Sequence, residues 1–155
     1  VWDRFKPLWG NEGMESLALS KDGGILTILE GSDGSAYRTF TYQGGISWAD
    51  GPRLQTDGRF HATDADFGPD GRLYVLERRL TIFRGIKSRI SVYDQTAAGF
   101  SAPETVMESG YGTYGDLEGL DVWMNASGQM IATVIADNNF AAGEPTLIAE
   151  FALSP

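Results

Sequence analysis

Acidic residues recur at both ends of a repeated hairpin pattern, and their type and spacing are suited to binding a metal ion. The pattern is an acid, an apolar run, a turn that ends in Gly, a second apolar run and a closing acid. Three copies give the pairs Glu15 and Glu30, Asp64 and Glu77, and Glu118 and Asp137. Carboxylates held within a few ångströms raise one another's pKa, and a hard divalent cation relieves that repulsion. The pairs therefore predict a metal site if the fold gathers them.

The elements that must position these acids are β-hairpins. The turns Asp22-Gly23, Asp70-Gly71 and Ser127-Gly128 lie between apolar runs. Gly adopts positive φ there at little cost, and Asp or Ser can bond to its own backbone. Further strands are expected at 36–42, 88–93 and 146–153, with fainter fourth strands at 45–48 and 105–108. Each copy therefore predicts an antiparallel sheet of up to four strands.

The spacing of the copies predicts an all-β fold made of propeller blades. The turn glycines are 48 (71 − 23) and 57 (128 − 71) residues apart, which is close to the length of one four-stranded blade. We expect a single partial β-propeller domain over 1–155, with blades at approximately 10–55, 56–110 and 111–155. Propellers close with roughly four to eight blades. A missing N-terminal half or a second chain is therefore expected to complete this one.

The blade arrangement predicts that the acids share one rim, because the first strand of a blade begins at the face where its second strand ends. Calcium accepts six to eight oxygen ligands in loose geometry, so it suits such a ring better than zinc does. The predicted metal ligands are Glu15, Glu30, Asp64, Glu77, Glu118 and Asp137. The alternative is that these acids cap strands near solvent and keep the protein soluble.

The chemistry expected of this site is metal-assisted hydrolysis of a phosphate ester. Calcium would neutralise phosphate charge, and Glu15 or Glu118 would accept a proton from the attacking water. Arg78 and Arg79 are predicted to hold phosphate oxygens, and Asn138 is a further predicted substrate-binding residue. His61 is the third predicted catalytic residue, with a hydrogen-bonded loop histidine as its alternative. A serine esterase fits less well, because the chain has no Gly-x-Ser-x-Gly motif.

The composition of the chain limits the classes of partner and metal site that are expected. The chain of 155 residues carries 12 Lys and Arg against 21 Asp and Glu, a net charge of −9, which disfavours nucleic acid and anionic membranes as partners. No apolar run approaches the roughly 20 residues of a membrane span. The absence of cysteine excludes disulfides and thiolate metal sites. The start at Val1 predicts a processed chain or a piece of a longer one.

Several stretches together resemble the phytase-like family, whose members are described as having "esterase-like activity of phytase". They are 11–18 (NEGMESLA), 71–78 (GRLYVLER), 83–90 (FRGIKSRI), 117–123 (LEGLDVW), 137–140 (DNNF) and 146–151 (TLIAEF). The resemblance implies a β-propeller domain similar to phosphoesterases, periplasmic or extracellular, with calcium as its metal and a phosphorylated small molecule as its substrate. It also implies that the N-terminal blades are absent here.

Two functions from different classes remain open at this level. The first is a calcium-dependent phosphoric ester hydrolase at the acidic channel mouth. The second is a non-catalytic propeller module that binds a protein or saccharide partner, which the lack of an evident nucleophile and base pair favours. Folds of this kind host unrelated functions, so the site has to decide between them.

Overall fold

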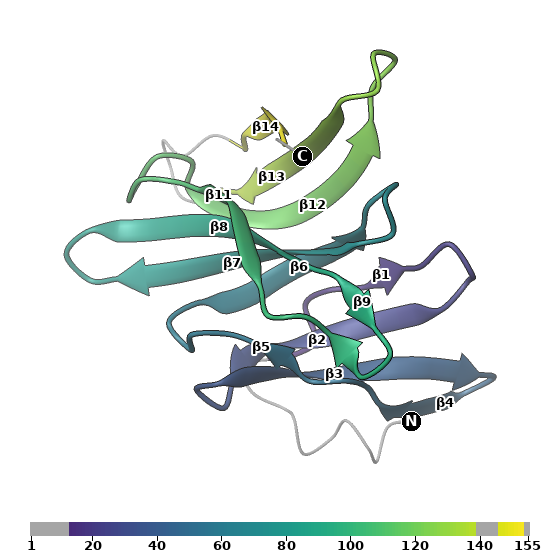
Figure 1. Ribbon diagram of the computed structural model, residues 1–155. Coiled ribbons are helices and arrows are strands. Elements are labelled where there is room, and N and C mark those ends of the chain that lie inside the picture. Colours follow the sequence, from purple (N-terminus) through teal and green to yellow (C-terminus); the bar gives the residue numbers. More distant parts are fainter. Residues whose placement is uncertain (1–12, 139–145, 154–155) are drawn as a thin grey trace.

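The computed structural model describes residues 13–138 and 146–153, and within them every regular element is a β-strand (Figure 1). All pairings between neighbouring strands are antiparallel. The prediction of an all-β antiparallel chain is therefore confirmed.

The first sheet contains residues 18–55. Its strands are β1 (Ala18–Leu19), β2 (Ile25–Ser32), β3 (Ala36–Gly44), β4 (Ser47–Asp50) and β5 (Leu54–Gln55). The order is β1-β2-β3-β4, and β5 pairs with the first residues of β3. The consecutive order follows from short turns, which join each strand to its neighbour.

The second sheet has the order β11-β8-β7-β6. Its strands are β6 (His61–Phe67), β7 (Leu73–Thr81), β8 (Gly85–Tyr93) and β11 (Glu104–Glu108). A small hairpin of β9 (Gln95–Thr96) and β10 (Gly99–Phe100) lies between β8 and β11 in the chain. The second sheet thus has the four strands that the sequence predicts.

The third sheet consists of β12 (Asp116–Met124), β13 (Met130–Asp137) and β14 (Ile148–Ala152), in that order. The first hairpin of each of the three sheets turns at a glycine with positive φ, at Gly23 (86°), Gly71 (81°) and Gly128 (79°). This is the backbone conformation that glycine adopts without strain. The three predicted hairpin turns are therefore present.

The second sheet lies between the other two, and each of its faces is buried (Figure 1). On β7, Leu73 and Val75 contribute to the core shared with the first sheet, while Tyr74 and Leu76 contribute to the core shared with the third. This alternation follows from the two-residue period of a strand. Residues 77 and 78 continue it, so adjacent side chains at the end of β7 enter different interfaces.

The strand ends that carry the predicted acids meet at the end of the molecule opposite the three glycine turns. Met14 forms a bridge with Leu29, beside the acids at 15 and 30. In the third sheet, Asp116 is the cross-strand partner of Asp137. The described strands therefore bring Glu30, Arg78 and Glu118, one from each sheet, to the same end, which is called the rim below.

Candidate functional site

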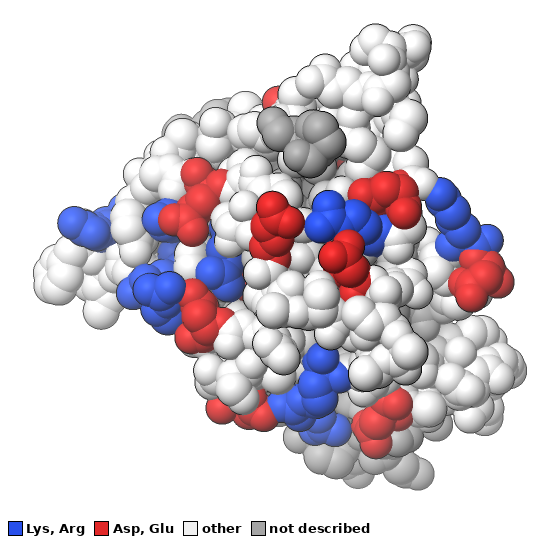
Figure 2. Space-filling model, viewed as in Figure 1, with Lys and Arg blue, Asp and Glu red and all other residues white. Residues whose placement is uncertain are grey.

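Arg78 is the centre of the rim. Its Nη2 lies 2.9 Å from Glu30 Oε1, and its Nη1 lies 2.5 Å from Asp116 Oδ2 and 3.4 Å from Glu118 Oε1. Glu30 comes from the first sheet, Arg78 from the second and the other two acids from the third. One guanidinium thus joins three sheets. On the face seen in Figure 2, acidic and basic side chains lie beside one another in the same way.

A hollow of about 380 Å³ lies against this cluster. It is lined by charged groups from all three sheets together with the start of the β7–β8 hairpin: Glu30, Arg59, His61, Arg78, Arg79, Leu80, Thr81, Ile86 and Asp116. Four of the residues predicted from sequence, at 30, 61, 78 and 79, are therefore brought together. The register explains part of this, because His61 on β6 is the cross-strand partner of Arg78 on β7.

Glu118 is the carboxylate whose protonation the rim alters. Burial raises its pKa above the usual value of 4.5, and the negative charge of Asp116 raises it further. Arg78 opposes that shift, while the more distant charges of Asp137 and Glu15 add to it. A raised pKa makes a carboxylate a stronger base, which suits a group that accepts a proton during catalysis.

Glu77 has a different environment from the rim acids, although the sequence grouped it with them. Its side chain is fully buried, and its oxygens accept hydrogen bonds from Arg89 Nε at 2.7 Å, Tyr37 Oη at 2.7 Å and Ser91 Oγ at 2.5 Å. Arg89 also contacts Asp57 Oδ2 at 3.1 Å. The prediction of Glu77 as a surface metal ligand is therefore corrected: it forms a cross-strand ion pair with Arg89 within the second sheet, on the face that packs against the first sheet.

Asp64 binds backbone rather than sharing a site with other acids. Its oxygens accept the N–H groups of Leu120 at 2.7 Å and of Ala65 at 2.8 Å. Asp66 accepts the N–H of Val122 in the same manner, at 2.8 Å. Burial raises the pKa of both carboxyls. These side chains join β6 to β12, where no backbone ladder connects the two sheets.

The remaining predicted residues lie at the margin of the rim. Glu15 is exposed and lines a neighbouring hollow of about 420 Å³ together with Asp64. Asp137 is exposed at the end of β13, and Asn138 follows it, half-buried. The charge of Asp137 adds to the raised pKa of Glu118, but neither Asp137 nor Asn138 lines the hollow beside Arg78.

The carboxylates of the rim are the groups that could bind calcium. Within residues 13–138 and 146–153, no group of three His, Asp or Glu side chains is placed to hold a metal ion. The three carboxylates that do converge surround a guanidinium, which already supplies positive charge. The described residues therefore do not fit a calcium ion in this arrangement, and we assign no step to one.

Sequence reasoning missed Asp116 and Arg59. Asp116 lies two residues before Glu118, and residues at this spacing share one face of a strand. The spacing was therefore a usable signal for Asp116. The register shift between Leu117 and Gly119 weakens that signal, because it alters the alternation locally. Arg59 lies in the segment before β6, which has no pattern that would place it in the hollow.

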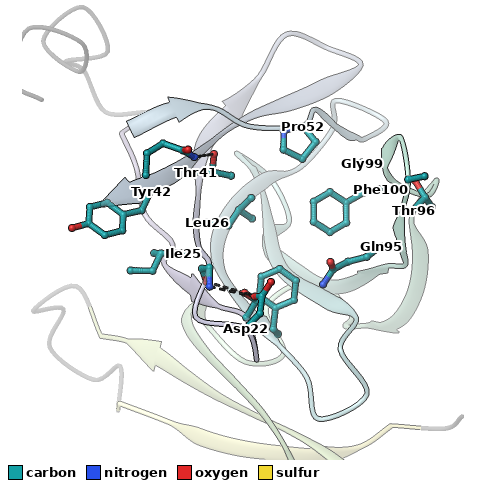
Figure 3. Close-up of a pocket in the computed structure, with 15 residues that line it drawn as sticks. Asp22, Ile25, Leu26, Thr41, Tyr42, Pro52, Gln95, Thr96, Gly99 and Phe100 are labelled. Carbon is teal, nitrogen blue, oxygen red and sulfur yellow. Dashed lines mark hydrogen bonds between the residues drawn. The ribbon is translucent and has the colours of Figure 1, made fainter. Parts of the chain in front are cut away.

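A larger hollow, of about 590 Å³, lies at the opposite end of the strands, and Figure 3 shows its lining. Phe100 and Pro52 form part of its wall, and Asp22 and Gln95 supply polar groups. The Ser20 hydroxyl and the Gly24 N–H lower the pKa of Asp22. None of the residues predicted from sequence lines this hollow.

The fold places the chain among all-β proteins built of packed antiparallel sheets. A comparison of its sequence with models of known families identifies the family. The family model described as "Phytase-like: Esterase-like activity of phytase" matches residues 6–140. The match covers most of the 155 residues, so the chain belongs to the phytase-like family. No match to a curated protein was found. The described residues include no helix of a length and apolarity that would cross a membrane.

Proposed function

We propose that this chain binds phosphate esters in the hollow beside Arg78 and catalyses their hydrolysis. The observation that carries the proposal is the hollow itself, in which three arginines and a histidine meet two carboxylates. The description of the family supports it, because a phytase acts on phosphate esters. Guanidinium groups suit this ligand, since their forked N–H donors match the geometry of phosphate oxygens.

The basic residues of the hollow would have two different roles. Arg78 already contacts three carboxylates, so it holds the rim together and orients Glu30 and Glu118. Arg79, Arg59 and His61 are the other basic groups in the lining. These three would contact the phosphate oxygens. The positive charge of the two arginines would offset the charge that develops as the ester bond breaks, and His61 would donate a ring N–H.

Glu118 is the proposed general base. Its carboxylate lies against Arg78, which itself lines the hollow, and its raised pKa makes it a stronger base toward a bound water. The water oxygen would bond to phosphorus while the ester P–O bond breaks. The departing alkoxide would take a proton from solvent, and Glu118 would return its own to solvent, so the net reaction consumes one water. Glu15, at the neighbouring hollow, is the second candidate for this role.

Three expectations from the sequence remain proposals. The three sheets are proposed as blades of a β-propeller that further blades or a second chain complete. Their strand order supports this, because each first strand lies next to the first hairpin of a neighbouring sheet. Calcium would have to recruit ligands beyond the described residues. A periplasmic or extracellular location also stays a prediction.

Turnover of p-nitrophenyl phosphate tests the proposal. We expect hydrolysis by the unaltered chain, a loss of about 100-fold in Glu118→Gln, and a loss of tenfold or more in Arg79→Ala. Arg38→Ala is the matched control, because Arg38 lies on β3 outside the hollow. Addition and chelation of calcium would show whether the metal contributes. Failure to bind inorganic phosphate or to hydrolyse the ester would overturn the proposal.

A non-catalytic binding module is the second candidate, and one observation favours it. The guanidinium of Arg78 is already surrounded by Glu30, Asp116 and Glu118, which is the arrangement of a structural clamp. In this case inorganic phosphate would bind without turnover, and Glu118→Gln would leave binding unchanged. Calorimetry with phosphate, run beside the turnover assay, separates the two candidates.

A further inference from the structure

The tip of the β7–β8 hairpin exposes a cluster of large apolar side chains. Leu80 is 72% exposed, Ile82 94% and Phe83 97%. Such side chains are normally buried, and a contiguous exposed group of them marks an interaction site. Ile82 and Phe83 have no part in the catalytic proposal, so their exposure needs its own explanation.

The exposure is built into a well-ordered hairpin. β7 and β8 stay in register up to the pair Thr81 and Gly85, with no shift along the strands. The Arg84 N–H donates to the carbonyl of Thr81 at 3.3 Å, and Gly85 has a φ of 81°. A three-residue loop closed by a glycine of positive φ is a regular hairpin turn. The backbone therefore holds Ile82 and Phe83 outward.

Another sheet of this fold would not cover the tip. The second sheet already has the first sheet on one face and the third on the other. Additional sheets would pack on the outer faces of those two, and not on the hairpin end. In Figure 1 the β7–β8 hairpin projects beyond its neighbours. Its partner must therefore approach from outside.

Basic residues flank the tip in an otherwise acidic chain. Residues 78–89 contain five Lys and Arg and no acid, whereas the whole chain carries −9. Arg78 and Arg89 lie in ion pairs at the base of the hairpin, so the cations that serve the tip are those nearer to it. Lys87 forms an ion pair with Glu108, and both Lys87 and Arg84 lie over the ring of Tyr111. Figure 2 shows Lys and Arg around the hairpin, whose tip is white. Arg79 adds another cation just before Leu80.

We propose that this tip docks on a lipid bilayer that contains anionic headgroups. Ile82 and Phe83 would enter the boundary between headgroups and acyl chains, while Arg79 and Arg84 would contact the phosphates. The net charge of −9 does not prevent this, because screening limits each charge to a range of about 8 Å at physiological ionic strength.

A bilayer fits the tip better than a protein partner does. A stable protein interface buries about 800 Å² on each side, and three side chains at a narrow hairpin end fall short of that. Membrane contact requires only a protruding apolar tip with cations behind it. Leu80 also lines the hollow beside Arg78, so docking would turn that hollow toward the headgroup phosphates. This last point rests on the proposed function, whereas docking does not.

A single fluorophore tests the proposal directly. The chain has no cysteine, so Phe83→Cys introduces one thiol for an environment-sensitive dye. Ile46→Cys is the matched control, because Ile46 is 80% exposed in the β3–β4 turn at the opposite end of the strands. With vesicles of phosphatidylcholine and phosphatidylglycerol we expect a blue-shifted, stronger emission at position 83 and no change at 46. An equal response at both positions, or none, overturns the proposal.

Flotation with the same vesicles tests the residues by loss of binding. We expect the pair Ile82→Ser and Phe83→Ser to lower vesicle binding at least tenfold, and Ile46→Ser to leave it unchanged. Arg84→Glu should weaken binding, whereas Lys21→Glu, at the other end of the molecule, should not. Equal thermal melting of all variants would show that the fold is intact. If the unaltered chain does not float with vesicles, the tip serves a protein contact and the proposal is wrong.

Discussion

Glu77 and Arg78 are neighbours on β7, yet they belong to two ion-pair clusters with opposite properties. Glu77 enters the interface with the first sheet, where Arg89 and Tyr37 contact it and no water reaches it. Arg78 enters the other face, where its side chain is 27% exposed. The same strand therefore builds a closed structural pair and an open cluster beside a hollow with consecutive residues.

The charge balance of the two clusters explains the difference. At Glu77 a guanidinium meets each carboxylate oxygen, so little unbalanced charge remains. At Arg78 one cation meets three carboxylates, and Glu118 keeps a raised pKa in spite of it. An excess of carboxylate beside solvent is costly to the fold, but it creates a group that can exchange protons. Arrangements of that kind concentrate at functional sites.

The largest expected effect comes from breaking the closed pair. Glu77→Ala would leave the guanidinium of Arg89 buried without its main partner, which costs about 3–5 kcal/mol of unfolding free energy. Urea denaturation would measure the loss. Glu104→Ala, in an exposed ion pair with Arg72, is the control and should change stability by about 0.5 kcal/mol or less. A similar small loss at Glu77 would contradict its structural role.

A smaller loss is expected from the open cluster. Arg78→Ala removes the shared cation from Glu30, Asp116 and Glu118, but partial exposure lets water compensate, so we expect about 1–3 kcal/mol. The variant also leaves three carboxylates together. Calcium should therefore raise its melting temperature more than that of the unaltered chain. A larger loss than in Glu77→Ala would reverse the comparison.

The smallest expected effect is on the pH dependence of the stability of the fold. Because the pKa of Glu118 is higher in the folded chain than its usual 4.5, the folded state binds more protons, and its stability falls as pH rises through that window. Glu118→Gln removes this dependence. We expect the variant to melt slightly higher than the unaltered chain at pH 7, with the gap closing below pH 4. A gap that widens in acid would show that ionised Glu118 stabilises the fold.

The strands and turns were predictable because their signals are local. An Asp-Gly or Ser-Gly pair between apolar runs specifies a hairpin, and the alternation on β7 specifies two buried faces. The position of Glu30 and Glu118 at one end of their hairpins followed from this topology. The predicted grouping of His61, Arg78 and Arg79 with Glu30 also agrees with the structure, since all four line one hollow.

The partner of each charge could not be predicted in the same way. Glu77 and Asp64 follow the repeat as well as Glu30 does, but one meets Arg89 and the other meets backbone N–H groups of β12. These partners lie 12 and 56 residues away in the chain. The choice between a metal and an arginine depends on which cation the packing delivers, and a repeat pattern carries no information about that.

The two carboxylates at 64 and 66 have one more consequence. They occupy two outward N–H groups on the free margin of β12, a margin that would otherwise offer a template for an added strand. Because the carboxylates at alternate positions occupy these N–H groups, they protect the edge of β12 from pairing with another strand. They also fix the position of the second sheet relative to the third. Replacement of Asp64 and Asp66 by Asn would keep the oxygen acceptors and so preserve this protection. Replacement of both by Ala would leave the N–H groups of the strand edge without acceptors and would favour aggregation.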